Sequence, residues 1–182
     1  MKLIKINMTI IALLALFSCS QQQNSMNTPE RVGELTVKSL MNDNIASFIE
    51  NVMLREGDFK AVFKYAYEHG GEKFKRKLKG KTVEEAFKEE EESMKRTMES
   101  GRESWSKTRY KGVEKGVDWK NIKYKSAAPT QLREIAGDLK RADILVSFSS
   151  GTDNFFFKLD DCLSIPDIGW RCEGIRNFKK SE

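Results

Sequence analysis

Histidine, proline and cysteine are scarce in this chain: its 182 residues include one histidine, three prolines and three cysteines. Metal sites are usually built from clusters of histidine, cysteine and acidic side chains. The single histidine, His69, is remote in sequence from Cys162 and Cys172. The sequence also contains no GxSxG, HExxH or glycine-rich phosphate-binding motif. It therefore predicts no catalytic site, no bound metal and no cofactor.

Long apolar runs are also missing. The run from Ile10 to Phe17 is unbroken, but a helix that spans a bilayer needs roughly 20 apolar residues. Lys2 and Lys5 precede this run, and serine and glutamine follow it. A basic start, a short apolar core and small residues near a cleavage point are typical of a secretory signal peptide. We expect residues 1–18 to be this signal.

The signal ends in Leu16-Phe17-Ser18-Cys19, which resembles the lipobox of bacterial lipoproteins. The resemblance implies that Cys19 is acylated and anchors the mature chain in a membrane, since several acyl chains together give durable attachment. Ser20, a residue other than Asp, implies the outer membrane and a protein that faces the periplasm. Residues 19–28 are expected to be a flexible tether. The alternative is an ordinary secreted protein with an incidental cysteine.

Two cysteines are left if Cys19 is acylated. Cys162 and Cys172 flank a segment in which Pro166-Asp167 favours a turn. Two strands that fold back at this turn would place the cysteines opposite each other, within disulfide range, and an export compartment permits oxidation. The alternative is a pair of free thiols with a redox or metal role.

Residues 29–182 are enough for one compact domain. Thr28-Pro29-Glu30 predicts the start of a helix that continues to about Met41. Turn-prone residues 42–44 interrupt it, and apolar residues at helical spacing then predict two more short helices, separated by a break at Gly57-Asp58. The second of these helices ends at His69-Gly70-Gly71, where the histidine is expected to stabilise the helix end and not to catalyse a reaction.

Residues 72–81 carry six basic side chains and one acidic side chain. The simpler interpretation is a solvated helix face with Phe74 and Leu78 turned inward. The alternative is a patch that binds anionic lipid head groups or an acidic partner. Nucleic acid is not expected as a partner, because the aromatic residues are not spaced as a stacking platform.

A long charged helix is predicted over residues 82–110. Its apolar residues lie at spacings that average near the helical period, and its acidic and basic residues form charge pairs three or four positions apart. Gly101 is expected to mark a bend. An alternative role for this helix is an interaction surface for a homodimer or for another envelope protein.

Strands are predicted in the C-terminal part of the chain. Alternating residues indicate a short strand at Ile122–Tyr124 that ends at Ala128-Pro129, and a second strand around Ile144–Phe148. Aromatic residues begin a third strand at 155–159, and the last strand is expected over 169–175. The last three strands have short connections and form an antiparallel meander. Helices followed by a meander predict an α+β fold.

The two ends of the chain resemble the NTF2-like (cystatin-like) superfamily, in particular its small lipoproteins of unknown function. The resemblance rests on the break at Leu40-Met41-Asn42-Asp43-Asn44 and on the closing strand Trp170-Arg171-Cys172-Glu173-Gly174-Ile175. It implies N-terminal helices packed on a curved antiparallel sheet around a cone-shaped cavity, with the long charged helix as an insertion.

Five aromatic residues are candidates for the wall of this cavity. Phe155, Phe157 and Trp170 are expected either in the core, which is the safer interpretation, or at the cavity wall. Tyr65 and Tyr124 are candidates to donate hydrogen bonds to a ligand, although no spacing selects them.

These features together predict a lipid-anchored envelope protein that binds a ligand or a partner and catalyses no reaction. One alternative is an enzyme or carrier that uses the cone-shaped cavity for a small molecule. The other is a protein–protein interaction module that uses the charged helix 82–110.

Overall fold

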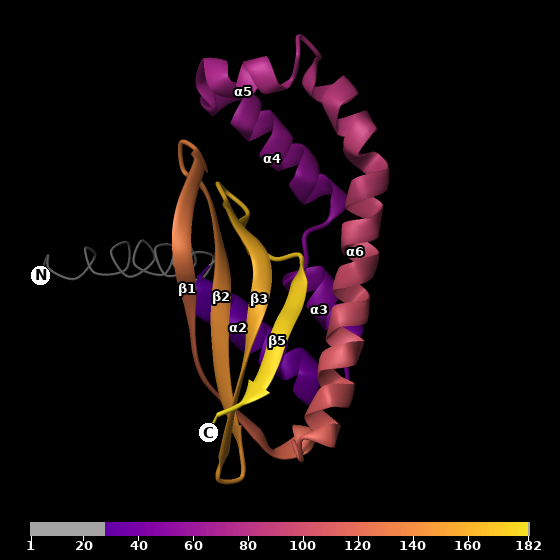
Figure 1. Cartoon of the computed structure of the whole chain (residues 1–182), viewed down its shortest axis with the longest axis vertical. Helices are drawn as coiled ribbons and strands as arrows, with labels where there is room; N and C mark the ends of the chain where they lie inside the picture. Colours follow the sequence, from indigo (N-terminus) through magenta and orange to yellow (C-terminus); the bar gives the residue numbers. More distant parts are fainter. Residues whose placement is uncertain (1–27, 182) are drawn as a thin grey trace, which may run out of the picture.

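The computed structural model describes residues 28–181 (Figure 1). The helices are α2 (Pro29–Met41), α3 (Ile45–Asn51), α4 (Glu56–His69), α5 (Gly71–Lys77), α6 (Val83–Glu114) and the 3-10 helix η2 (Trp119–Asn121). The strands are β1 (Ile122–Ala136), β2 (Leu139–Ser150), β3 (Asp153–Ile165), β4 (Gly169–Arg171) and β5 (Gly174–Lys180). This order confirms the predicted α+β class. The predicted signal peptide, Cys19 and all but the last residue of the tether lie outside the described residues.

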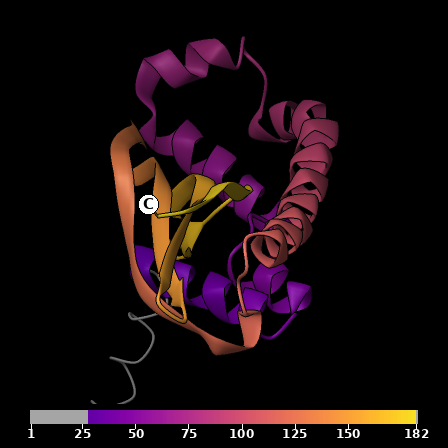
Figure 2. The same cartoon turned by 60° about the horizontal axis from the view of Figure 1, so that its bottom comes forward.

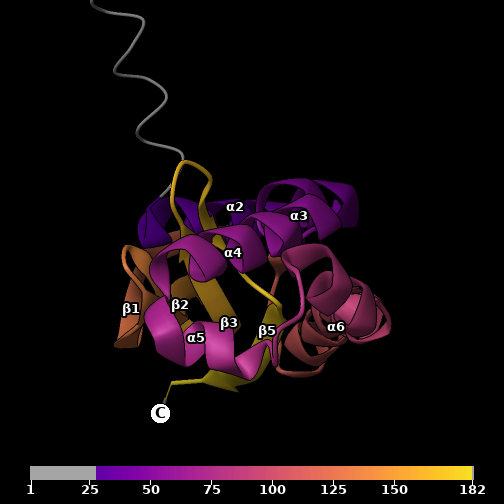
Figure 3. The ribbon, with the colours of Figure 1, turned by 90° about the horizontal axis from the view of Figure 1, so that it is seen from above.

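The sheet is antiparallel and open. Strands β1, β2, β3 and β4 pair in that order, and β5 also pairs with β3. Because β4 pairs with Leu163–Ile165 and β5 with the earlier part of β3, the two short strands follow each other along one edge of β3. Helices α2 and α3 lie against one face of the sheet, and α6 runs beside β5 (Figures 1 to 3).

The main core lies between α2 and the sheet. Helix α2 approaches β1 so closely that a Cβ atom added at Gly33 would lie 2.4 Å from the Cβ of Ala127. Aromatic rings fill the sheet side of this core: Phe148 stacks on Phe155 with ring centroids 5.6 Å apart, and Phe155 stacks on Phe178 at 5.9 Å. Burial of such large apolar side chains is the main stabilising contribution to a fold of this size.

A smaller core lies under α4. Its buried members are Leu54, Ala66, Ala136, Leu139 and Ile165. They come from α4, from the segment before it and from the strand ends at the β1–β2 and β3–β4 turns. Helix α4 therefore covers one end of the sheet (Figure 1).

Helix α2 begins and ends where the sequence predicts, and α3 begins directly after the predicted interruption at residues 42–44. The Thr28 side chain accepts from the Arg31 amide at 3.2 Å, and Pro29 is the first helical residue. The Asn44 side chain accepts from the Ser47 amide at 3.0 Å and so caps α3. These caps satisfy amide groups that have no acceptor within the helix.

The predicted break at Gly57-Asp58 is wrong. Helix α4 already begins at Glu56, so both residues lie in its first turn. The buried Asp58 carboxylate accepts from the Arg55 amide at 2.9 Å and thereby caps the helix from inside that turn. Asp58 therefore does signal the helix start, but it lies three residues after the N-cap residue Arg55, at the N3 position of a capping box.

The strand predictions fall short in two places. Pro129 does not end β1: it pairs with Ile144 in the middle of the strand, which is tolerated because β1 is an edge strand and needs no amide donor on its free side. The predicted last strand, 169–175, is instead divided into β4 and β5, with Cys172 and Glu173 between them. The second of these strands continues to Lys180.

The long charged helix is confirmed, and it extends four residues beyond the predicted end. Gly101 lies within it and is buried against β5: an added Cβ atom would lie 2.2 Å from the Glu173 carbonyl oxygen and 2.4 Å from the Met53 Cε. Gly101 thus permits close packing of α6 against the connection between β4 and β5 and against the start of β5. Within residues 28–181, no helix combines the length and the apolar content needed to cross a bilayer.

Gly101→Ala is expected to destabilise the protein by about 1–3 kcal/mol, because backbone atoms must shift to admit the methyl group. The free energy of unfolding from urea titrations provides the measurement. Gly57→Ala is the matched control, because nothing lies within 4 Å of its added Cβ and alanine favours a helix by up to about 1 kcal/mol. Equal stability of the two variants would contradict the close approach of α6.

Candidate functional site

The connection between β4 and β5 is held at Cys172. A disulfide joins Cys172 to Cys162 in β3, and their Cα atoms are 3.9 Å apart. The Cys172 amide donates to the Val52 oxygen at 2.8 Å, and its carbonyl oxygen accepts from the Leu54 amide at 2.9 Å. Both cysteines are fully buried. The next residue, Glu173, therefore starts from a backbone position that is fixed on two sides.

Helix α6 meets the start of β5 through two glycines. A Cβ atom added at Gly174 would lie 3.1 Å from the Gly101 Cα and 2.7 Å from the Ser104 Oγ. The Ser104 hydroxyl accepts from the Ile175 amide at 2.9 Å and donates to the Gly101 oxygen at 2.6 Å. This pair of hydrogen bonds joins the helix directly to the outer edge of β5.

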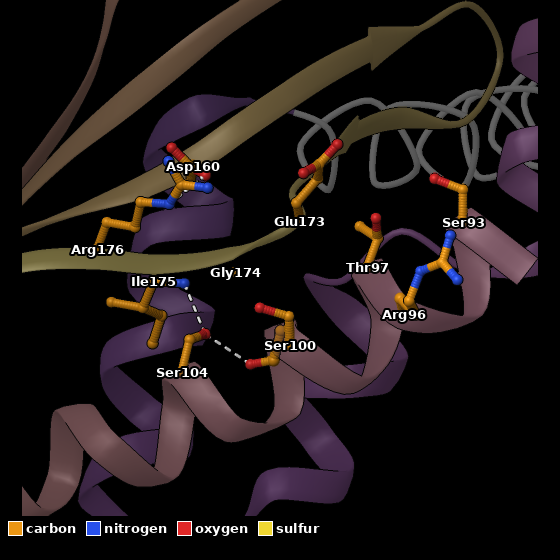
Figure 4. A pocket seen from close by; sticks show the side chains of 11 residues that line it. Ser93, Arg96, Thr97, Ser100, Ser104, Asp160, Glu173, Gly174, Ile175 and Arg176 are labelled. Carbon is orange, nitrogen blue, oxygen red and sulfur yellow. Dashed lines mark hydrogen bonds and ion pairs between the residues drawn. The ribbon is translucent and has the colours of Figure 1, made fainter.

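A polar groove with a volume of about 320 Å³ opens beside this contact (Figure 4). One wall is α6, and the other is formed by the β4–β5 connection, β5 and Asp160 of β3. A second cavity of about 390 Å³ adjoins the groove and shares Ser93, Thr97 and Glu173 with it. It is lined mainly by α4, α6 and the connection between α5 and α6.

Four hydroxyl side chains line the α6 wall of the groove. They are spaced four, three and four residues apart along the helix, which places them on one face: Ser93, Thr97, Ser100 and Ser104. Only Ser104 uses its hydroxyl in a hydrogen bond within residues 28–181. The other three hydroxyls are free to bind a ligand.

Glu173 faces this row from the opposite wall (Figure 4). Its side chain is half-buried, and its carboxylate has neither an ion pair nor a hydrogen bond among the described residues. Burial raises the pKa of the Glu173 carboxyl group, and the negative charges of Asp161 and Asp160 raise this pKa further. A residue whose half-buried carboxylate lies in a groove and has a raised pKa is a candidate functional residue.

Asp160 lies nearby but is already paired. Asp160 is 8% exposed, and its carboxylate lies 2.7 Å from the Arg176 Nε. Burial raises the pKa of Asp160 in spite of this arginine. Of the two carboxylates that line the groove, Glu173 is therefore the one that can accept a new partner without loss of an ion pair.

Asp143, Asp160 and Asp161 offer oxygen atoms within 4.8 Å of one another. Each of these carboxylates has its own cation: Lys158 lies 3.4 Å from Asp143, Arg176 pairs with Asp160, and the Arg141 Nε donates to Asp161 at 2.8 Å. A metal ion at this cluster would compete with three ion pairs, so we interpret the cluster as a charge-paired network of the sheet.

The five aromatic residues predicted for a cavity lie elsewhere. Phe155 and Phe157 are 1% and 0% exposed and belong to the main core, as does Trp170. The Tyr65 hydroxyl accepts from the Asp138 amide at 3.2 Å, and the Tyr124 hydroxyl donates to the Glu30 oxygen at 3.2 Å. None of the five lines the groove or the adjoining cavity. The core interpretation therefore holds for Phe155, Phe157 and Trp170.

His69 and the basic stretch 72–81 are also outside the groove. His69 is the last residue of α4, and its ring packs against that of Tyr65 at a tilt of 31°, with ring centroids 4.2 Å apart. In the basic stretch, Leu78 is buried and Phe74 packs against the smaller core, as expected for a solvated helix with an apolar side.

The residues of the groove were not predicted from the sequence. The feature that could have revealed the α6 wall is the helical spacing of its four hydroxyl residues: Ser93, Thr97, Ser100 and Ser104. These residues form a row next to the apolar residues of the same helix. Glu173 carried no signal of its own, because its position depends on the disulfide and on the glycine contact between α6 and β5.

No family model, curated protein or solved structure matches this chain.

Glu173→Gln is expected to raise the free energy of unfolding at pH 7 and to have a smaller effect at pH 4. The pKa of Glu173 is higher in the folded chain than in the unfolded chain, so ionisation of this group opposes folding. The cost is complete above the folded pKa, and it vanishes below the unfolded value of about 4.3. Urea titrations at the two pH values measure the difference.

Glu99→Gln is the matched control for this charge removal, because Glu99 is an exposed residue of α6. It is expected to change stability by less than about 0.5 kcal/mol at either pH. The measured quantity is the free energy of unfolding of Glu173→Gln minus that of the wild type. A difference that is smaller or more negative at pH 7 than at pH 4 would contradict burial of the ionised carboxylate.

Proposed function

We propose that this chain is a lipid-anchored protein of the bacterial cell envelope that binds a small polar ligand and catalyses no reaction. The observation that carries the binding function is the groove between α6 and β5, in which Glu173 and three hydroxyl groups have no partner within the described chain. Its volume of about 320 Å³ is at the lower end of the range of known ligand pockets, about 300–1,000 Å³.

The envelope location rests on two features that are independent of each other. The first is the lipobox-like sequence that ends at Cys19, with Ser20 favouring the outer membrane and a periplasmic orientation. The second is the disulfide between Cys162 and Cys172, a bond that persists in oxidising compartments such as the periplasm. A lipid anchor would hold the groove close to a membrane surface.

A binding role is favoured over catalysis by the composition of the groove. Its described lining contains no histidine, lysine or cysteine, and the Ser104 hydroxyl is already committed to backbone groups on both sides. Nucleophilic catalysis needs a hydroxyl or thiol within hydrogen-bond reach of a base, and among the described residues Glu173, the carboxylate that could act as a base, makes no hydrogen bond to a hydroxyl group. The groove offers hydrogen bonds and charge, which are the requirements of recognition.

The proposal includes an NTF2-like arrangement of the fold. The helix pair α2–α3, with its break at Asn42-Asp43-Asn44, and the antiparallel sheet that it covers support this assignment. In this arrangement the aromatic residues of β3 fill the core, and the ligand site lies at the edge of the sheet, where the long helix α6 has been added.

Lipidation is tested by mass spectrometry of the full chain after expression in a bacterium. We expect the mature protein to begin at Cys19 and to carry acyl mass, and we expect it in the membrane fraction. Cys19→Ala should abolish the acyl mass, whereas the control Cys162→Ala should retain it. A wild-type chain with an unmodified N-terminus would rule out the anchor.

A further inference from the structure

We infer that the groove binds a small hydroxylated molecule that carries a protonated amine, and that the ammonium group lies at Glu173. The inference deepens the proposed binding function, on which it rests, by naming the class of ligand. Three observations carry it: the charge of Glu173, the row of hydroxyl groups opposite, and the size of the groove.

Among the described residues, no ion pair or hydrogen bond balances the charge at Glu173. The charged groups that share the groove with it or act on its pKa come from four elements: Asp160 and Asp161 of β3, Arg141 of β2, Arg176 of β5 and Arg96 of α6. The adjoining cavity, which Glu173 also lines, adds Glu89 and Glu90 of α6 and Lys79 and Lys81 of the connection before it, where Lys81 pairs with Glu89. Arg176 pairs with Asp160 and Arg141 with Asp161. These four charges cancel in pairs, and the carboxylate of Glu173 is the charge that is left on this wall.

An ammonium group is the chemical partner that this carboxylate lacks. A charge-assisted hydrogen bond is roughly twice as strong as a neutral one, and its strength increases where the surroundings are partly desolvated. A cation would also offset the repulsion from Asp160 and Asp161. A ligand without a positive charge would leave the cost of burying Glu173 in place.

The opposite wall selects the rest of the ligand. Ser93, Thr97 and Ser100 present hydroxyl groups that donate and accept hydrogen bonds, and their side chains are too short to fill the groove themselves. Their spacing along α6 matches a ligand with several polar groups in a row. The volume of about 320 Å³ limits this ligand to a small molecule or to one end of a larger one.

Arg96 gives the inference a competing outcome. It lines the groove, is exposed, and has no ion pair among residues 28–181. An anionic ligand would bind at this arginine instead of at Glu173. The amine is favoured because Glu173 is half-buried and fixed next to the Cys172 disulfide, whereas the Arg96 side chain is exposed.

Three probes with nearly the same hydroxylated chain separate these outcomes. N-methyl-D-glucamine is positively charged at pH 7, sorbitol is neutral, and gluconate is negatively charged. Each is titrated into the purified full chain in detergent, and the backbone amide signals of Thr97, Ser100 and Gly174 are followed by NMR. We expect N-methyl-D-glucamine to bind at least about tenfold more tightly than sorbitol, and gluconate to bind most weakly.

Two variants and one control place the site. Glu173→Gln is expected to weaken N-methyl-D-glucamine binding by at least about tenfold, and Ser100→Ala by several-fold. Glu99→Gln removes the same charge from an exposed position on α6 and should leave binding unchanged. Binding is also expected to weaken as the pH falls through the pKa of Glu173, which burial raises, because the protonated carboxyl group no longer attracts the ammonium.

Each other result overturns the inference in a recognisable way. Equal binding of sorbitol and N-methyl-D-glucamine would show that the groove recognises hydroxyl groups alone, and tighter binding of gluconate would assign recognition to Arg96. Both results would leave the proposed binding function intact. Absence of binding by all three probes would overturn the ligand class, and the lipidation experiment would still test the anchor separately.

Discussion

The fixed point of this structure is the backbone of Cys172, which a disulfide and two backbone hydrogen bonds hold against β3 and against the segment after α3. Because these three bonds hold Cys172, they also position Glu173 and Gly174 at the edge of the sheet. Helix α6 can then approach this edge only where it has no side chain, which is at Gly101. The two walls of the groove are therefore positioned by backbone contacts. Glu173 and the hydroxyl groups of Ser93, Thr97 and Ser100 are left without a partner among the described residues.

The same helix shows why a groove exists at this place. Its buried apolar side chains, such as Met94 and Trp105, fill the space between α6 and the rest of the protein. On the adjacent face, serine and threonine stand where larger side chains would close the gap. Close backbone packing at Gly101 and short polar side chains beside it together leave a polar groove against a half-buried carboxylate. Such a space suits recognition of a polar molecule better than a purely apolar cavity would.

Local signals in the sequence accounted for much of the fold. Thr28-Pro29 and Asn44 set helix starts through contacts within four residues, and the turn at Pro166-Asp167 lies between the two paired cysteines. Predictions failed where distant parts of the chain decide the outcome. Pro129 lies within a strand because β1 happens to be at the sheet edge, and Glu173 gained its importance from α6, whose contacting residues lie about seventy positions earlier. The groove was missed for this reason, although the row of hydroxyl residues was visible in the sequence.

The central claim is that the disulfide and the two backbone hydrogen bonds of Cys172 hold an unpaired Glu173 carboxylate in a half-buried position. NMR titration of the Glu173 carboxyl carbon, before and after reduction of the disulfide, tests it most directly. The account predicts that Glu173 in the oxidised protein titrates at a higher pH than the value of about 4.3 for a glutamate in a peptide, and that reduction lowers the titration midpoint. A midpoint at or below 4.3 in the oxidised protein, or one that reduction does not change, would contradict it.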